Sequence, residues 1–211
     1  MVGRRAYDLM YRLWTPWDAV GVRPELRRLA DDGELTATDH RRVIDLGCGT
    51  GANAVFLAAR GHQVVGVDFA PVALRKAEAR ARAAGVEDRC RFLEADLTAS
   101  DLPDQVGGPF DLIVDASSLD DLDADGRAIL AGHLARLARP GAVMLCWCWY
   151  TARNELPRIS FTGPSRLSPG IDPGEEHRLF GDAFDIEVLR PPHRHEACLL
   201  LRRRADVAGH A

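Results

Sequence analysis

The chain of 211 residues lacks several features that would assign it to a particular class of protein. No stretch approaches the roughly 20 apolar residues of a membrane span, and the first residues contain no apolar signal-peptide core. Lys76 is the only lysine, and the net charge of −4 provides no basic field for binding nucleic acid. These absences predict a cytoplasmic protein that acts on neither membranes nor nucleic acids.

Cysteine is present in small number and without a pairing pattern. The five cysteines are Cys48, Cys90, Cys146, Cys148 and Cys198. Their odd number and scattered positions predict reduced thiols instead of a disulfide framework. Two of them alternate on one face of a predicted strand, but no second close pair completes the four ligands of a structural metal site. We therefore predict no metal.

Strand and helix signals alternate along most of the chain after residue 42. The predicted strands are Val43–Leu46, Gln63–Val67, Arg91–Glu94, Phe110–Val114 and Ala142–Trp149. Helical patterns cover about residues 51–60, 71–85 and 123–139, with a short one within 98–106. Short links between alternating elements predict an α/β fold with a mostly parallel sheet covered on both faces. The apolar fraction of 46% is sufficient for the core of one such domain.

The two ends of the chain depart from this alternation. Phe184–Leu189 and Glu196–Leu201 are separated by six residues, too few for a crossover helix, so we predict an antiparallel hairpin. Residues 4–32 predict two helices joined through residues 15–18, which makes 1–42 a helical cap and 43–211 the core. The aperiodic segment Thr151–Pro173 contains four prolines and is predicted to be a long loop; such loops are often functional, and the alternative is a solvated connector.

The strongest functional motif is VIDLGCGTGA, which runs from Val43 to Ala52. Gly47, Gly49 and Gly51 stand between a buried strand and a helix. Glycine adopts positive φ and has no Cβ, so a ligand can touch the backbone where the free N–H groups of the helix point. The motif predicts a Rossmann-like doubly wound sheet that binds a nucleoside-bearing cofactor. The alternative is a glycine-rich turn without a ligand.

Carboxylates that follow the next two strands suggest which cofactor this is. Asp68 is placed to bind ribose hydroxyls, although it could instead stabilise the start of the helix at Pro71. Nicotinamide cofactors and S-adenosylmethionine both carry this ribose. Phe69 could pack on adenine, and Asp96 could meet its amino group. Together with the antiparallel hairpin, which replaces a sixth parallel strand, these residues favour S-adenosylmethionine.

From about residue 43 to 149 the chain resembles the class I S-adenosylmethionine-dependent methyltransferases. The matching runs are VIDLGCGTG (43–51), VVGVDFAP (64–71), RFLEADL (91–97), FDLIVDASSLDDL (110–122) and LARPGAVMLCWCW (137–149). The resemblance implies that the backbone of the glycine loop surrounds the methionine part of the cofactor. It assigns cofactor-binding roles to Asp45, Gly47, Cys48, Gly49, Asp68, Phe69, Asp96, Leu97, Asp115 and Ala116.

The N-terminal run YDLMYRLWTPWDAVGVRPEL (7–26) resembles the opening of small bacterial methyltransferases of the thiopurine, thiol and halide type. This resemblance implies that Trp17 approaches the methionine end of the cofactor. An aromatic face beside a sulfonium cation gains cation–π attraction, which supports the assignment. The alternative is that Trp17 fastens the N-terminal helices to the core.

The resulting hypothesis is methyl transfer from S-adenosylmethionine to a small-molecule acceptor with a sulfur, oxygen or nitrogen nucleophile. A thiolate needs no base, whereas a phenol, alcohol or protonated amine does, and His177 and Asp120 are the candidate bases. The sequence 115–118 is Asp-Ala-Ser-Ser and lacks the Asn/Asp-Pro-Pro-Tyr/Phe signature of family members that methylate nucleic-acid amines.

Two other functions remain open: an NAD(P)-dependent oxidoreductase of the same architecture, and a non-enzymatic protein that binds S-adenosylmethionine.

Overall fold

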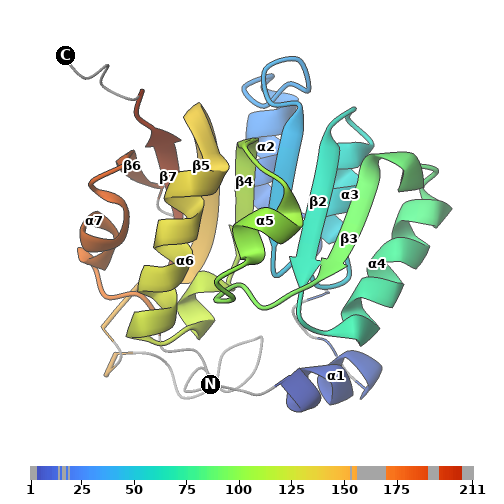
Figure 1. Ribbon diagram of the computed structural model, residues 1–211, viewed down its shortest axis with the longest axis horizontal. Helices are drawn as coiled ribbons and strands as arrows, with labels where there is room; N and C mark the ends of the chain where they lie inside the picture. The colour runs from blue at the N-terminus through green and yellow to red at the C-terminus, as the bar shows by residue number, and fades with distance from the viewer. Residues whose placement is uncertain are drawn as a thin grey trace.

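The computed structural model describes residues 4–13, 15, 18, 20–152, 154–155, 170–189 and 195–205. Its centre is a seven-stranded sheet with the strand order β3-β2-β1-β4-β5-β7-β6 (Figure 1). The parallel strands are β1 (Arg42–Leu46), β2 (Gln63–Asp68), β3 (Cys90–Glu94), β4 (Phe110–Ala116) and β5 (Ala138–Trp149). The predicted hairpin is confirmed, because β7 (Glu196–Arg203) pairs antiparallel with both β5 and β6 (Phe184–Leu189).

Helices cover both faces of the sheet, as the alternating pattern predicts (Figure 1). Successive strand residues point to opposite faces, so Val43 joins one apolar cluster and Ile44 the other. The first face carries α2 (Pro24–Asp31), α3 (Ala52–Ala58) and α4 (Pro71–Ala83). The second carries α5 (Leu102–Val106), α6 (Ala124–Leu137) and α7 (Glu175–Phe180). The 3-10 helices η2 (Glu87–Arg89) and η3 (Leu119–Asp121) lie in the connections. The doubly wound α/β fold is confirmed.

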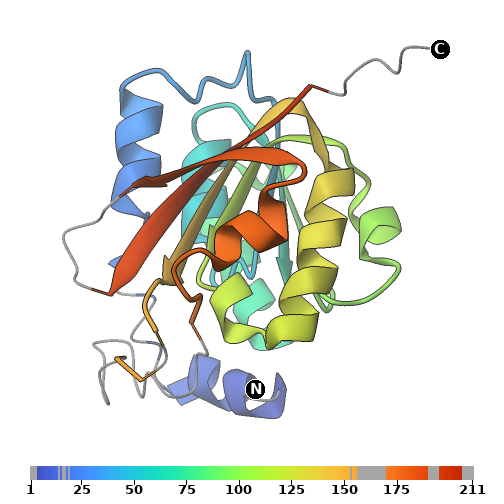
Figure 2. The ribbon, with the colours of Figure 1, turned by 90° about the vertical axis from the view of Figure 1, so that its left-hand side faces the viewer.

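The N-terminal helices lie in different places. The α2 side chains Leu26 and Leu29 are buried in the same apolar cluster as Val43, so α2 is part of the core. By contrast, α1 (Arg4–Leu13) lies beside α4 at the edge of the sheet where β2 ends (Figures 1 and 2). Only α1 is therefore positioned as a cover for the carboxyl ends of the strands, the edge where open α/β sheets bind ligands.

The boundary between α6 and β5 differs from the prediction. The pattern predicts a helix to about Arg139 and a strand from Ala142, but α6 ends at Leu137 and β5 begins at Ala138. Ala138 pairs with Phe110 before the register shifts, so Pro140 and Gly141 lie at an irregularity inside the strand. Proline and glycine are tolerated in strands at such bulges, which explains why a sequence that reads as a helix stop is part of a strand.

None of the helices in the described part of the chain is long and apolar enough to cross a membrane.

Candidate active site

The glycine loop between β1 and α3 is shaped by backbone conformations that favour glycine. Gly47, Gly49 and Gly51 have φ of 57°, 52° and 78°. A Cβ on Gly47 would lie 1.8 Å from Ser118 Oγ, and one on Gly49 would lie 2.9 Å from Tyr11 Oη. The loop therefore faces both the segment that follows β4 and the cover formed by α1, and it leaves no space for a side chain.

Asp45 lies in β1 directly before this loop and has an unusual environment. Its side chain is 1% exposed, and neither carboxylate oxygen has a hydrogen-bond partner among the described residues. Burial raises the pKa of the Asp45 carboxyl to about 8, and the nearby Asp115 and Asp68 act in the same direction. Buried carboxylates are normally paired, so Asp45 marks a position where a cationic partner would be stabilised.

Asp68 links the glycine loop to the start of α4. One carboxylate oxygen accepts a hydrogen bond from the Gly49 N–H at 2.9 Å, and the other accepts one from the Ala70 N–H at 2.8 Å. The side chain is 4% exposed, and burial raises its pKa. The structure thus shows that Asp68 joins the glycine loop to the residue before α4, and both ribose binding and stabilisation of the helix start stay predictions.

Replacing Asp68 with alanine should reduce the stability of the protein as well as its affinity for the cofactor. Two buried N–H groups would lose their acceptor, which predicts a loss of about 1–3 kcal/mol in the free energy of unfolding. Denaturant titration would measure this loss, with Asp101→Ala as the control, because Asp101 is exposed and makes no side-chain cap to α5. Equal stability of the two variants would contradict the linking role.

The residues predicted to meet adenine lie beside Asp68. The Phe69 ring packs edge-to-face on Tyr7 of α1, with 5.3 Å between ring centroids. Asp96 follows β3, is exposed, and accepts hydrogen bonds from the backbone N–H and hydroxyl of Thr98 at 2.8 and 2.7 Å. The Leu97 side chain is buried in the core. The structure brings the ends of β2 and β3 together, and contact with adenine stays a prediction.

The end of β4 carries a strained residue that the sequence analysis did not single out as functional. Ser117 has φ of 70°, in the left-handed region that a non-glycine residue rarely adopts. Its hydroxyl accepts a hydrogen bond from the Arg23 guanidinium at 3.4 Å. Strained residues are common at functional sites. The strain leaves no signal in the sequence, and Arg23 comes from a segment distant along the chain.

Asp115 lies just before this residue, at the predicted position beside the transferred methyl group. It is fully buried, and one of its oxygens accepts a hydrogen bond from the Ser118 N–H at 2.8 Å. Burial raises the pKa of the Asp115 carboxyl to about 7. Ala116, the last residue of β4, is half-buried next to it. Asp45 and Asp115 thus place two buried carboxyls with raised pKa on neighbouring central strands.

The candidate bases are on different elements. Asp120 is buried in η3 and accepts a hydrogen bond from the Trp149 N–H at the end of β5, at 2.9 Å. The His177 side chain is 70% exposed on α7, and its Nε2 lies 3.6 Å from Glu176 Oε1. That oxygen also accepts a hydrogen bond from the Tyr150 hydroxyl at 2.9 Å. A role as base stays a prediction for both.

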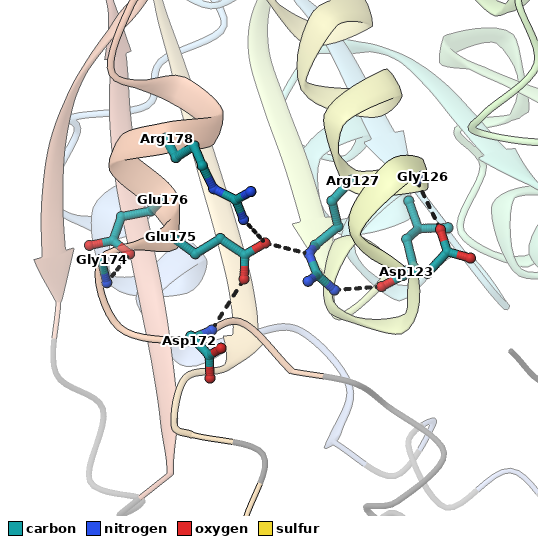
Figure 3. A network of polar contacts seen from close by, with 9 residues as sticks. Asp123, Gly126, Arg127, Asp172, Gly174, Glu175, Glu176 and Arg178 are labelled. Carbon is teal, nitrogen blue, oxygen red and sulfur yellow. Dashed lines mark hydrogen bonds and ion pairs between the residues drawn. The ribbon is translucent and has the colours of Figure 1, made fainter.

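A buried ion pair fixes α7 against α6 (Figure 3). The carboxylate of Glu175 accepts hydrogen bonds from Arg127 at 2.9 Å and from Arg178 at 3.1 Å. Arg127 also donates to the backbone oxygen of Leu122. Glu176, the next residue of α7, accepts the hydrogen bond from Tyr150, which follows β5. Trp17 lies outside the described residues, so its role in cofactor binding stays a prediction.

Comparison with known proteins agrees with this architecture. Residues 43–141 match the family model of a methyltransferase domain. The chain is also similar in fold to a solved structure from a study of the conversion of a disulfide bond into a thioacetal group during echinomycin biosynthesis. The TM-score is 0.69 and the identity 25%, over 96% of this chain and 93% of that one.

These similarities support the assignment of the chain to the class I S-adenosylmethionine-dependent methyltransferases.

Curated relatives match the chain over part of their own length. The 2-heptyl-1-hydroxyquinolin-4(1H)-one methyltransferase of Mycobacteroides abscessus is 33% identical over 60% of this chain and 52% of that protein. The release factor glutamine methyltransferase of Chlorobaculum tepidum is 43% identical over 42% of this chain and 31% of that protein. The chain therefore spans about a third to a half of the length of these relatives. Their names describe a small-molecule acceptor in one case and a protein in the other.

S-adenosylmethionine, the cofactor of this family, fits the residues that the structure brings together. The cofactor carries a cationic amino group, and Asp45 presents a buried carboxylate without a partner directly before the glycine loop. The loop offers backbone at Gly47 and Gly49, where a Cβ would meet neighbouring atoms. The donor set thus has the negative charge and the free backbone groups that the methionine part of the cofactor needs.

Proposed function

We propose that this methyltransferase transfers a methyl group from S-adenosylmethionine to a small-molecule acceptor with a sulfur, oxygen or nitrogen nucleophile. The observation that carries the proposal is the unpartnered, buried Asp45 carboxylate beside a glycine loop. The small-molecule acceptor is supported by the quinolone named for one relative and by the net charge of −4, which offers no attraction for nucleic acid.

The cofactor would be held along the carboxyl ends of β1, β2, β3 and β4. The backbone of Gly47, Cys48 and Gly49 would surround the methionine part and Asp45 would meet its amino group. Asp68 would bind the ribose; Phe69, Asp96 and Leu97 would contact adenine; Asp115 and Ala116 would border the transferred methyl. When bound, the cofactor supplies an electrophilic methyl group on a sulfonium ion. The protein's contribution is to align the nucleophile and to exclude water.

The need for a base depends on the acceptor. A thiolate attacks without one, whereas a hydroxyl or a protonated amine must lose a proton. Asp120 is better placed than His177 to act near the methyl group, because η3 begins two residues after Ser117 and three after Ala116. His177 would act from α7, at the far side of the end of β5.

Methyl-labelled S-adenosylmethionine provides the test of the proposed function. The protein is incubated with the labelled cofactor and with separate small-molecule, RNA and protein fractions of a cell extract. Label should appear in the small-molecule fraction, and label in RNA or protein alone would contradict the proposed acceptor class. A parallel titration should show binding of S-adenosylhomocysteine and none of NAD(P); the reverse would favour an oxidoreductase. Tight cofactor binding without label in any fraction would favour the non-enzymatic alternative.

Deleting residues 1–13 should lower turnover sharply while the sheet stays folded. α1 is attached to the rest of the protein by the Tyr7 hydroxyl, which donates to Asp121 at 2.6 Å, and by Lys76, which donates to the backbone oxygen of Tyr11. Without this cover the reacting groups would be wet and poorly aligned. Turnover and thermal unfolding measure the effect, with Leu13→Ala as the control because Leu13 is 76% exposed. Full activity of the truncated protein would disprove the covering role.

A further inference from the structure

Arg23 is held in a fixed position at the start of α2. Its backbone N–H donates to Asn53 Oδ1 of α3 at 3.3 Å, and Pro24 begins the helix directly after it. The helix is anchored to the core by the buried Leu26 and by Glu25, which accepts a hydrogen bond from the Trp147 indole at 2.6 Å. The guanidinium therefore projects from a backbone that cannot easily shift.

The guanidinium lies at the end of β4, next to the predicted methyl-transfer position. It donates a hydrogen bond to Ser117 Oγ at 3.4 Å. Ser117 is the residue with the left-handed backbone, and this backbone directs its hydroxyl toward Arg23. Arg23 forms no ion pair with a carboxylate among the described residues, whereas Arg127 is paired with Glu175. A guanidinium has five N–H donors, so most of those of Arg23 remain for another partner.

The charged groups that face Arg23 do not provide that partner. Glu25 is directed to the Trp147 indole. Asp115 is fully buried and accepts a hydrogen bond from the Ser118 N–H, and the attraction of Arg23 lowers its pKa less than burial raises it. The nearby thiol of Cys198 is buried, and burial raises its pKa, so it stays neutral. The site thus combines a preorganised cation and a hydroxyl beside the place where the acceptor must lie.

We propose that Arg23 binds a carboxylate of the acceptor, so that the substrates of this enzyme are small organic acids. The planar fork of a guanidinium matches a carboxylate through two parallel hydrogen bonds, and Ser117 Oγ could donate a third. The inference rests on the proposed methyl transfer, since it places the acceptor at the end of β4. Arg23 would thus determine which acceptor binds, and it would take no part in cofactor binding.

Benzoate and its neutral isostere benzamide provide the test. Calorimetric titration of the protein saturated with S-adenosylhomocysteine should show that benzoate binds and that Arg23→Gln weakens it about tenfold or more, the range for a lost charged hydrogen bond. Benzamide should bind weakly and equally to both proteins. Arg28→Gln is the matched control, because Arg28 lies on the same helix and is exposed, in an ion pair with Asp32. Affinity for S-adenosylhomocysteine should be the same in all variants.

A second variant and a second titration distinguish the role of Arg23 from loss of folding and from failure of the proposed function. Arg23→Lys retains the charge but loses the fork, so it should show an intermediate loss, and it carries the test if Arg23→Gln unfolds. Repeating the benzoate titration without S-adenosylhomocysteine separates this inference from the proposed function. Failure to bind S-adenosylhomocysteine would count against methyl transfer. Absence of benzoate binding, or equal binding by the wild type and both Arg23 variants, would overturn the role of Arg23.

Discussion

Replacing Gly49 with valine should abolish the binding of S-adenosylhomocysteine, whereas the same change at Gly85 should leave it intact. Both glycines have positive φ, 52° at Gly49 and 66° at Gly85, so both variants bear a similar backbone strain of about 1–2 kcal/mol. They differ in their surroundings. A Cβ on Gly49 would lie 2.9 Å from Tyr11 Oη, while one on Gly85 has no atom within 4 Å. The comparison therefore isolates crowding of the loop from strain.

Calorimetry and thermal unfolding can both measure this effect. Ligand present at a hundred times its dissociation constant stabilises a protein by about 2.7 kcal/mol, and this stabilisation should vanish in Gly49→Val but persist in Gly85→Val. Because the clash involves α1, Gly49→Val should also loosen this helix from the glycine loop. Unchanged affinity in Gly49→Val would remove the glycine loop from the cofactor site.

The sequence predicts the sheet well because its signals are local. Val43–Leu46 and Phe110–Val114 are apolar runs with clear limits, and both are buried central strands. The short link between the last two strands requires a hairpin, which the structure confirms. The same reasoning predicts that the carboxylates after successive parallel strands lie near one another, because the carboxyl ends of parallel strands meet at one edge of the sheet. The prediction is wrong at Pro140 and Gly141, where pairing with β4 outweighs the local preference.

The parts of the site that the sequence misses depend on contacts between distant segments. Arg23 and Ser117 are 94 residues apart, and although each lies in a run that resembles known methyltransferases, the sequence pattern singles out neither as functional. The left-handed backbone of Ser117 is imposed by its neighbours, because its N–H donates to the Trp147 carbonyl and the following residue donates to Asp115. Likewise, helical periodicity predicts that α1 is a helix but not that it crosses the end of β2 while α2 joins the core.

Replacing Asp45 with asparagine should stabilise the free protein at alkaline pH and weaken its binding of S-adenosylhomocysteine. Burial raises the pKa of Asp45 from its ordinary 3.8 to about 8, with Asp115 and Asp68 acting in the same direction. Between pH 3.8 and about pH 8, the Asp45 carboxyl is ionised in the unfolded chain but still protonated in the folded protein. Stability must therefore fall as the pH rises from about 4 to about 8 and level off above it. Asparagine does not ionise, so this loss of stability is absent in Asp45→Asn. The free energy of unfolding of the variant should therefore exceed that of the wild type most near pH 8, and the difference should vanish near pH 4.

The affinity for the cofactor should depend on pH in the opposite direction to the stability of the free protein. The cationic amino group of S-adenosylhomocysteine stabilises the ionised carboxyl, which lowers the pKa of Asp45 and releases a proton on binding. Affinity in the wild type should therefore increase between about pH 6 and pH 8, and this increase should be smaller in Asp45→Asn. Calorimetry in buffers with different ionisation enthalpies would detect the released proton. Equal affinity and equal pH dependence of the two proteins would show that Asp45 does not meet the cofactor.

Asp111→Asn is the matched control for Asp45→Asn, because Asp111 is a buried carboxylate that already has partners. It lies at the opposite end of the sheet, where one oxygen is 2.7 Å from Arg139 and the other accepts a hydrogen bond from the Arg42 N–H at 2.8 Å. Its replacement should lower stability near pH 7 by about 1–3 kcal/mol, because a charged hydrogen bond is lost, and leave S-adenosylhomocysteine binding unchanged. Opposite signs for two buried aspartates would show that the Asp45 site is built for a ligand, since a carboxylate retained for folding alone would resemble Asp111.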